Sequence, residues 1–191
     1  MRDRIAPDRA ERVKMVALDV DGVLTDNGVY IGTTEGGEKV ELKRFDIQDG
    51  LGVHMLKRAG LIVVLISGRF SEATEVRASE LELEAFQAPG GAKIPAFEEL
   101  IERYELTWEE IAFLGDDLAD LPAMKRVGLP IAVANAVAEI RAEAIWQTTR
   151  PGGSGAVREF AEELLTARGE WARLVAEYCR DREGIRDDTE E

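Results

Sequence analysis

The stretch Asp19-Val20-Asp21-Gly22-Val23-Leu24-Thr25-Asp26 follows directly on a largely apolar run over residues 13–18. Such a run predicts a buried strand, and the loop that leaves a strand of this kind carries the chemistry of an open α/β sheet. Asp19 falls at the end of the strand, and Asp21 falls two residues later in a turn that contains Gly22. The stretch therefore predicts two carboxylates in one small polar volume.

Two carboxylates in one pocket can take different roles in phosphoryl transfer. An ionised Asp19 beside Mg²⁺ can attack phosphorus, while Asp21 can give a proton to the leaving oxygen and take one from water. The alternative is a solvated turn at a strand end that has no chemistry. A D-x-D-G pattern directly after an apolar strand is rare by chance, which favours the catalytic interpretation.

The composition predicts one folded domain. The chain has 191 residues, of which 45% are hydrophobic, and this is enough for one sizeable core. Its formal net charge of −14 argues against nucleic acid or a membrane surface as a partner, because like charges repel. The single cysteine, Cys179, leaves no internal disulfide and no cysteine metal cluster. Since no apolar run reaches membrane-spanning length and residues 1–12 lack the apolar core of a signal peptide, we expect a cytoplasmic protein.

Short apolar runs alternate with helical patterns along the chain. Strands are predicted at residues 15–18, 61–66, 85–87, 111–114, 130–134 and 145–147, and helices at residues 51–58, 71–80, 94–104, 118–125 and 137–143. This βα alternation predicts an α/β fold with a doubly wound, Rossmann-like parallel sheet. A β-hairpin is predicted at residues 29–45, where it would overhang the acidic loop.

The chain divides into three parts by composition. Residues 1–12 are expected to form a polar N-terminal extension, and residues 13–179 the folded domain, whose helical pattern resumes at residues 155–178. Residues 180–191 are charged and poor in apolar side chains, so we expect a disordered tail there.

Polar residues also follow the later predicted strands. Ser67 and Arg69 come after the run at residues 61–66 and supply donors suited to phosphate or carboxylate oxygens. Lys93 follows the loop Pro89-Gly90-Gly91-Ala92 and could reach a transferring phosphoryl group, although a lone loop lysine is more often solvated.

A second acidic loop, Gly115-Asp116-Asp117-Leu118-Ala119-Asp120, follows the predicted strand at residues 111–114. These aspartates could simply cap a helix. Because Mg²⁺ prefers oxygen ligands, Asp19 and Asp116 with a backbone carbonyl and waters would equally form a magnesium site.

Four segments in this order resemble the motifs of the haloacid dehalogenase superfamily of phosphotransferases. They are the acidic loop at residues 19–26, residues 67–69, Lys93 and the acidic loop at residues 115–120. The resemblance narrows at Phe45-Asp46-Ile47-Gln48-Asp49-Gly50-Leu51-Gly52 and at Arg150-Pro151-Gly152-Gly153-Ser154-Gly155-Ala156-Val157-Arg158-Glu159, which are similar to segments of the 3-deoxy-D-manno-octulosonate 8-phosphate phosphatases. It covers residues 14–165 without a large insertion, which implies a domain that lacks a cap. Members of that family assemble as tetramers, so the resemblance implies a homo-oligomer.

The resemblance also implies the role of each site residue. Asp19 would be the nucleophile, and Asp21 the acid/base that also gives its main-chain carbonyl to Mg²⁺. Ser67 and Lys93 would hold the phosphoryl group, and Asp116 would be the second carboxylate ligand, with Asp117 and Asp120 in support. Substrate contacts would come from Asp46, Ile47, Gln48, Asp49, Gly50, Arg69, Arg77 and Lys93.

Two positions depart from the family pattern. Gln48 lies where some members carry arginine, and His54 lies where a basic side chain can face the sugar acid. His54 also stands at helical spacing beside Leu51 and Met55, so packing within a helix is an equal alternative. Both departures bear on the identity of the substrate and leave the type of reaction unchanged.

The resemblance therefore implies a Mg²⁺-dependent phosphatase that hydrolyses 3-deoxy-D-manno-octulosonate 8-phosphate through an aspartyl-phosphate, in the lipopolysaccharide synthesis of a bacterium. The nearest alternative substrate is a nine-carbon ulosonic acid 9-phosphate. Alternatives of other classes are a phosphoacceptor signalling domain and a non-catalytic oligomeric scaffold of the same fold. An apolar hairpin with Val29, Tyr30, Ile31, Val40 and Leu42 could pack on its own domain, but its edges favour an oligomer.

Overall fold

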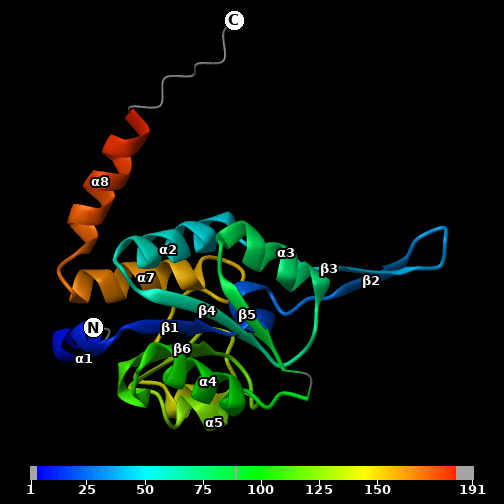
Figure 1. The fold of residues 1–191 in the computed structure, drawn as a ribbon, viewed down its shortest axis with the longest axis horizontal. Coiled ribbons are helices and arrows are strands. Elements are labelled where there is room, and N and C mark those ends of the chain that lie inside the picture. The colour runs from blue at the N-terminus through cyan, green and yellow to red at the C-terminus, as the bar shows by residue number, and fades with distance from the viewer. Residues whose placement is uncertain (1–3, 89, 184–191) are drawn as a thin grey trace, which may run out of the picture.

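Six parallel strands form the central sheet of the computed structural model, which describes residues 4–88 and 90–183 (Figure 1). In spatial order they are β5 (Glu84–Gln87), β4 (Ile62–Ser67), β1 (Met15–Leu18), β6 (Ile111–Gly115), β7 (Leu129–Ala132) and β8 (Trp146–Gln147). The chain winds outward from β1 to β5, then returns to β6 and winds outward to β8. The strand order therefore reverses between β1 and β6, which is where an open α/β sheet leaves a crevice for a ligand.

The centre of the sheet is apolar on both faces. All four residues of β1 are buried, and Leu18 pairs in register with Leu65 of β4 and Leu114 of β6. A parallel strand covered on both faces needs a continuous apolar run rather than an alternating one. Burial of β1 on both faces explains why its sequence is a continuous apolar run, from which the strand could be predicted.

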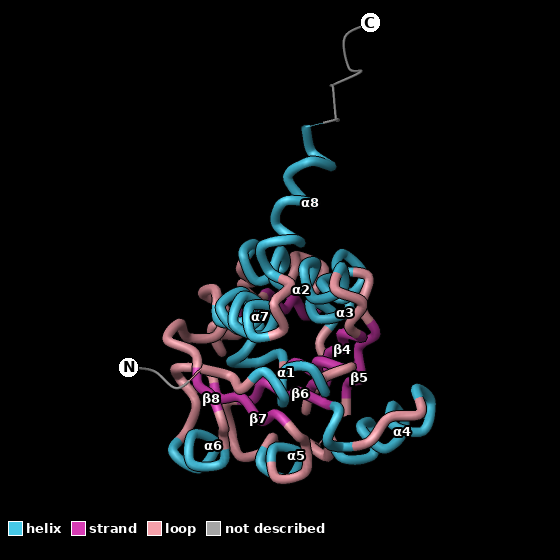
Figure 2. Tube along the Cα trace, turned by 90° about the vertical axis from the view of Figure 1, so that its left-hand side faces the viewer, coloured by secondary structure: helices cyan, strands magenta, loops and turns pink. Residues whose placement is uncertain are grey.

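Helices cover both faces of the sheet (Figure 2). One layer contains α2 (Ile47–Arg58), α3 (Glu72–Leu81) and α7 (Ala156–Ala167), and the other contains α4 (Ile94–Tyr104), α5 (Leu121–Met124) and α6 (Ala138–Glu143). Helices α2 and α7 pack closely because Gly52 faces the backbone of Arg158, where a Cβ atom would lie 2.8 Å from Arg158 Cα. The doubly wound α/β fold is confirmed.

A two-stranded hairpin extends beyond the body of the domain (Figure 1). It consists of β2 (Tyr30–Thr33) and β3 (Lys39–Leu42), paired antiparallel with Tyr30 opposite Leu42. An isolated bridge between Thr25 and Phe45 closes its base. In the described part of the chain this hairpin is the insertion between β1 and α2, so the expectation of a domain without a cap is confirmed.

Several boundaries differ from the predicted ones. Helix α2 begins one turn early, because the side chain of Asp46 accepts a hydrogen bond from the Gln48 backbone at 2.7 Å and caps it. The predicted helix at residues 118–125 shortens to α5, because Asp120 binds the backbone at the start of that segment. The helical pattern at residues 155–178 breaks at Gly169, where φ is +71°.

Both ends of the described chain form helices in segments that the sequence predicted to lie outside the folded domain. Within residues 1–12, α1 (Pro7–Arg12) packs on the core, with Ala10 fully buried and Arg168 donating to its carbonyl at 3.2 Å. At the other end, α8 (Trp171–Glu183) continues past the expected start of the tail at residue 180, and Asp181 pairs with Arg58 at 2.6 Å. The rest of that tail lies outside the described residues. None of the helices in the described ranges is long and apolar enough to cross a membrane.

Candidate active site

The crevice at the carboxyl ends of β1, β4 and β6 gathers five of the predicted site residues: Asp19, Asp21, Arg69, Lys93 and Asp116. A cleft of about 230 Å³ is lined by Asp19, Asp21, Asn27, Gly68, Arg69, Gly91, Lys93, Asp116, Asp117, Ala119 and Asp120. It lies where the strand order reverses, as the topology requires.

A tight turn over Val20–Leu24 brings the two acidic loops together. Gly22 in this turn has φ of +91°, and a Cβ atom there would lie 1.9 Å from Asp116 Oδ2. Only glycine permits this approach and this backbone conformation. Asn135 holds the turn by donating to the Gly22 carbonyl at 3.0 Å.

Lys93 lies at the centre of the carboxylate cluster. Lys93 is only 3% exposed, and its ammonium contacts Asp19 Oδ1 and lies 2.5 Å from Asp120 Oδ1. Lys93 follows Gly90 and Gly91, and this segment packs closely on the loop after β4. A Cβ atom added to Gly68 would lie only 3.1 Å from Gly91 Cα. The structure thus places Lys93 in the site and not in solvent.

Asp120 organises the second acidic loop. Its Oδ2 accepts hydrogen bonds from the backbone of Asp116 at 2.9 Å and of Asp117 at 3.3 Å, while its Oδ1 faces Lys93. Both of its oxygens are therefore engaged. Asp117 itself accepts from the Leu118 backbone at 2.7 Å, so both supporting acids shape the loop.

The electrostatics of the cluster are unusual, because three buried carboxylates meet one lysine. Burial, followed by the charge of Asp120, raises the pKa of Asp19 from 3.8 to about 7 even though Lys93 opposes the shift. Burial, followed by the charge of Asp19, raises the pKa of Asp116 from 3.8 to about 8. When ionised, these carboxylates would carry negative charge that the described side chains do not compensate, so without a cation they hold their protons more tightly than free carboxyls do.

This donor set fits a divalent cation. Oxygen atoms of Asp19, Asp116 and Asp120 lie within 4.8 Å of one another. Both oxygens of Asp120 are engaged, by Lys93 and by the backbone, whereas Lys93 contacts Asp19 at Oδ1, so Asp19 and Asp116 would be the carboxylates with an oxygen free to bind metal. Hard oxygen ligands and uncompensated negative charge are what Mg²⁺ requires.

The Asp21 carboxylate lies beside two cations. Lys43 Nζ is 2.7 Å from its Oδ1, and Arg69 Nη1 is 3.8 Å from its Oδ2. Sequence reasoning had named Arg69 but missed Lys43. A lysine in an exposed hairpin pattern carries no signal of its own, and only the fold shows that it turns inward.

Ser67 and Arg69 shape the loop after β4. The Ser67 hydroxyl donates to the Arg69 carbonyl at 2.9 Å. The Arg69 guanidinium binds both oxygens of Glu41, at 3.2 and 2.9 Å. Arg69 is therefore tied to the hairpin at the edge of the cleft.

The segment from Asp46 to Gly50 forms the first turn of α2 and contains both exposed and buried side chains. Ile47 is 86% exposed, and Gln48 accepts a hydrogen bond from Arg150 at 2.8 Å. Asp49, in contrast, is fully buried and accepts from the backbones of Gly155 and Arg158 at 3.2 and 2.9 Å. The Asp49 carboxylate therefore binds the start of α7, and its predicted contact with the substrate stays a prediction.

Arg77 lies over the same turn. Its Nη2 donates to the Asp46 carbonyl at 3.3 Å, and a Cβ atom on Gly50 would fall 2.7 Å from this nitrogen. Its guanidinium also stacks over Phe45 at 5.6 Å. Arg77 and Gly50 are thus brought together next to the base of the hairpin.

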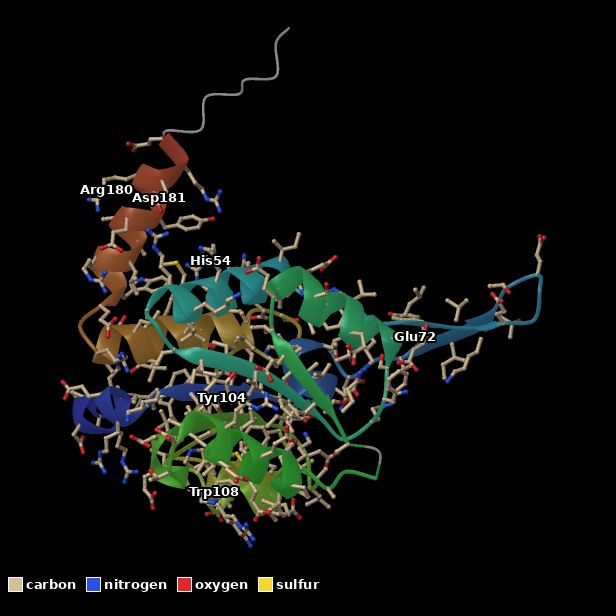
Figure 3. All side chains as sticks on the ribbon, in the orientation of Figure 1. His54, Glu72, Tyr104, Trp108, Arg180 and Asp181 are labelled. Atoms are coloured by element: carbon tan, nitrogen blue, oxygen red, sulfur yellow. The ribbon has the colours of Figure 1, made fainter. Side chains whose placement is uncertain are left out.

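His54 lies apart from the cleft, on the side of α2 that faces α8 (Figure 3). Its ring meets Tyr178 of α8 edge to face at 5.7 Å. Partial burial, followed by the nearby charge of Arg58, lowers the pKa of His54, which favours the neutral ring. This position agrees with the packing alternative for His54, and the predicted contact with the substrate stays a prediction.

Comparisons with known proteins agree with this fold. Residues 66–159 match the family model of the haloacid dehalogenase-like hydrolases, which gives the class. The 3-deoxy-D-manno-octulosonate 8-phosphate phosphatase of Escherichia coli K12 is 38% identical over 161 residues, 84% of each chain. The Yersinia pestis phosphatase of the same name is 37% identical over 160 residues, 84% of this chain and 83% of its own.

Solved structures give the same result. The phosphatase of this name from Moraxella catarrhalis, in complex with magnesium, phosphate and the sugar acid, has a TM-score of 0.83 and 35% identity over 90% of this chain and 97% of its own. The cobalt-bound Haemophilus influenzae enzyme has a TM-score of 0.78 and 34% identity over 88% of this chain and 99% of its own. This chain therefore belongs to the 3-deoxy-D-manno-octulosonate 8-phosphate phosphatase family of haloacid dehalogenase-like hydrolases.

The raised pKa values predict how metal and pH affect stability. Because the pKa values of Asp19 and Asp116 are raised from 3.8 to about 7 and about 8, the folded protein binds more protons than the unfolded chain between these values. The free energy of unfolding of the metal-free protein should therefore fall as pH rises through this window. Mg²⁺ should oppose the loss, adding about 2.7 kcal/mol at ~100 times its Kd.

Thermal melting in chelator and in Mg²⁺, from pH 5 to pH 8.5, measures this effect. Asp116→Asn should abolish most of the Mg²⁺-dependent stabilisation, while Glu139→Gln, in the first turn of α6, serves as a control. Equal stabilisation of the wild type and Asp116→Asn by Mg²⁺ would contradict the assignment of this site.

Proposed function

We propose that this protein hydrolyses 3-deoxy-D-manno-octulosonate 8-phosphate to the free sugar acid and inorganic phosphate, with Mg²⁺ as cofactor. The observation that carries the proposal is the similarity in sequence and length, since a relative named for this reaction is 38% identical over 84% of each chain. The uncompensated carboxylates fit the magnesium that the Moraxella structure contains. We place the reaction in lipopolysaccharide biosynthesis and in the cytoplasm.

In this proposal Asp19 is the nucleophile. Its carboxylate oxygen forms a bond to phosphorus as the bond from phosphorus to the sugar oxygen breaks, which gives an aspartyl-phosphate. Lys93 contacts Asp19 already, so its ammonium is placed to hold phosphoryl oxygens. Ser67, at the end of the neighbouring strand β4, would supply its hydroxyl to the same group by turning it away from the Arg69 carbonyl.

Asp21 handles the protons in both halves of the reaction. It gives its proton to the leaving sugar oxygen, and the resulting carboxylate then takes a proton from the water that attacks the aspartyl-phosphate. That attack releases phosphate and regenerates Asp19. Mg²⁺, held by Asp19, Asp116 and the Asp21 carbonyl, supplies charge neutralisation for the phosphoryl group when it is bound.

The sugar acid would lie toward the base of the hairpin. Arg69 and Arg77 lie there with the first turn of α2, and two guanidinium groups suit the carboxylate and hydroxyl groups of such a substrate. Ile47 and Gln48 present exposed side chains on that turn. We propose them as contacts to the substrate, while Asp46 and Asp49 hold the turn in shape.

Phosphate release from a panel of sugar phosphates tests the substrate. The eight-carbon ulosonic acid 8-phosphate should be turned over with the highest kcat/KM, and only with Mg²⁺ present, because the carboxylates otherwise repel the anionic substrate. A nine-carbon ulosonic acid 9-phosphate and simple hexose phosphates provide the comparison. A preference for the nine-carbon acid would overturn the substrate and keep the reaction, and no release from any would favour a scaffold.

Substitution of the acid/base tests the mechanism. Asp21→Asn should lower kcat by about 10²- to 10⁴-fold, the usual contribution of general acid–base catalysis. Asp26→Asn changes an exposed aspartate just beyond the same turn and should keep wild-type turnover. Full activity of Asp21→Asn would rule out the proposed role.

We also propose that the chain forms a homo-oligomer through its hairpin. The support is a row of exposed apolar side chains, with Tyr30 and Ile31 62% and 66% exposed and Leu42 61%. Tyr30 and Leu42 form a cross-strand pair on one face, and such an apolar edge commonly marks an interface.

Tyr30→Lys should therefore reduce the molecular mass measured by light scattering to a smaller assembly, because a buried charge opposes association. Ile145→Lys, at another exposed apolar position that is 43% exposed, should leave the mass unchanged. A wild-type protein that is monomeric at micromolar concentration would overturn the proposal.

A further inference from the structure

The side chain of Lys43 has no solvent exposure, although it follows a strand of the exposed hairpin. Its ammonium lies 2.7 Å from Asp21 Oδ1 and donates to the Thr74 hydroxyl at 3.2 Å. Thr74 is itself fully buried on α3. Three segments therefore meet at this one nitrogen: the hairpin, the turn after β1 and helix α3.

Attachment of the hairpin to the domain does not explain a lysine at this position. Burying an ammonium costs several kcal/mol, and an apolar side chain of similar volume usually holds two elements together at least as well. Lys39, four residues earlier on the same hairpin strand, shows the ordinary arrangement, with a side chain that is 65% exposed. The buried charge at Lys43 calls for a partner whose position matters.

That partner is the Asp21 carboxylate. Within the described residues, Lys43 and Arg69 are the two cations within 4.0 Å of it, and Lys43 is the nearer by more than an ångström. The Asp21 side chain is 18% exposed, so solvent has little part in orienting it. Neither of its oxygens accepts a hydrogen bond from the described residues, so the ion pair with Lys43 at Oδ1 is the closest contact that can fix the carboxylate.

We propose that Lys43 is a positioning residue for the reaction, which holds the Asp21 carboxylate in the orientation that transfers protons to the leaving oxygen and from water. The inference rests on the proposed function, in which Asp21 is the acid/base. Within the described residues, the Lys43 ammonium contacts Asp21, Thr74 and, at 4.0 Å, Glu41, and it makes no ion pair with Asp19 or Asp116. Its loss should therefore affect the rate of the chemical steps and leave substrate affinity nearly unchanged.

A double-mutant cycle tests the proposal. Lys43→Met, which keeps volume and removes charge, should lower kcat by about 10- to 100-fold and change KM by less than ~3-fold, because misorientation forfeits part of the acid–base contribution. In an Asp21→Asn background the same change should have an effect below ~2-fold, since the interaction is already gone. Lys43→Arg should recover part of the rate.

The controls separate positioning from a structural role. Lys39→Met is the matched lysine variant on the same strand and should keep wild-type kcat. Melting temperature and inhibition by inorganic phosphate show whether the Lys43→Met site is folded. If it is not folded, Thr74→Val replaces it, because this nearly isosteric change removes the hydroxyl that orients the ammonium and should lower kcat only when Asp21 is present.

Two outcomes would overturn the proposal: wild-type kcat in folded Lys43→Met, or equal losses with and without Asp21. Each comparison is repeated with p-nitrophenyl phosphate, since hydrolysis of the aspartyl-phosphate uses Asp21 whatever the leaving group. Turnover of this ester without turnover of the ulosonic acid phosphate would reject the proposed substrate, and the cycle would still decide the role of Lys43.

Discussion

The contact of Lys93 with Asp19 and Asp120 is the interaction on which the site depends. Three carboxylates with one ammonium cannot be buried at low cost, because each desolvated charge must be compensated by a neighbour. The raised pKa of Asp116 reports the charge left over. The ionised carboxylates of the folded chain thus need a further positive charge, which a divalent cation would supply. The bound cation would in turn attract the anionic phosphoryl group.

The sheet and its glycines make this crowding possible. The carboxyl ends of β1 and β6 are neighbours at the reversal of strand order, so the loops after them must share one volume. Gly22 and Gly115 each lie where a Cβ atom would collide with an aspartate of the other or the same loop, at 1.9 and 2.8 Å. Because these glycines have no Cβ atom, the backbone can lie against the aspartate side chains. The carboxylates of the two loops can therefore come close together.

Sequence patterns predicted what is set locally, and missed what is set by contact between distant segments. The central strand at residues 15–18 and the acidic residues after it could be read directly, since a buried parallel strand is uniformly apolar. Asp49 and His54 could not, because a carboxylate that binds the start of α7 and a ring that packs on Tyr178 have the same local sequence as substrate contacts. Lys43 was missed for the same reason: its inward direction depends on α3 and on the turn after β1.

The two aspartates of the first loop are each held by a lysine from a different part of the fold. Lys93 stands at the start of α4 and fixes Asp19 from within the domain, whereas Lys43 comes from the hairpin and reaches Asp21. A nucleophile must keep one position relative to the bound phosphoryl group, while an acid/base must serve first a sugar oxygen and then a water. Holding Asp21 through the hairpin links its position to the element that also holds Arg69. Any contact that displaces the hairpin would then move the proposed acid/base and a proposed substrate contact together, and would leave the proposed nucleophile in place.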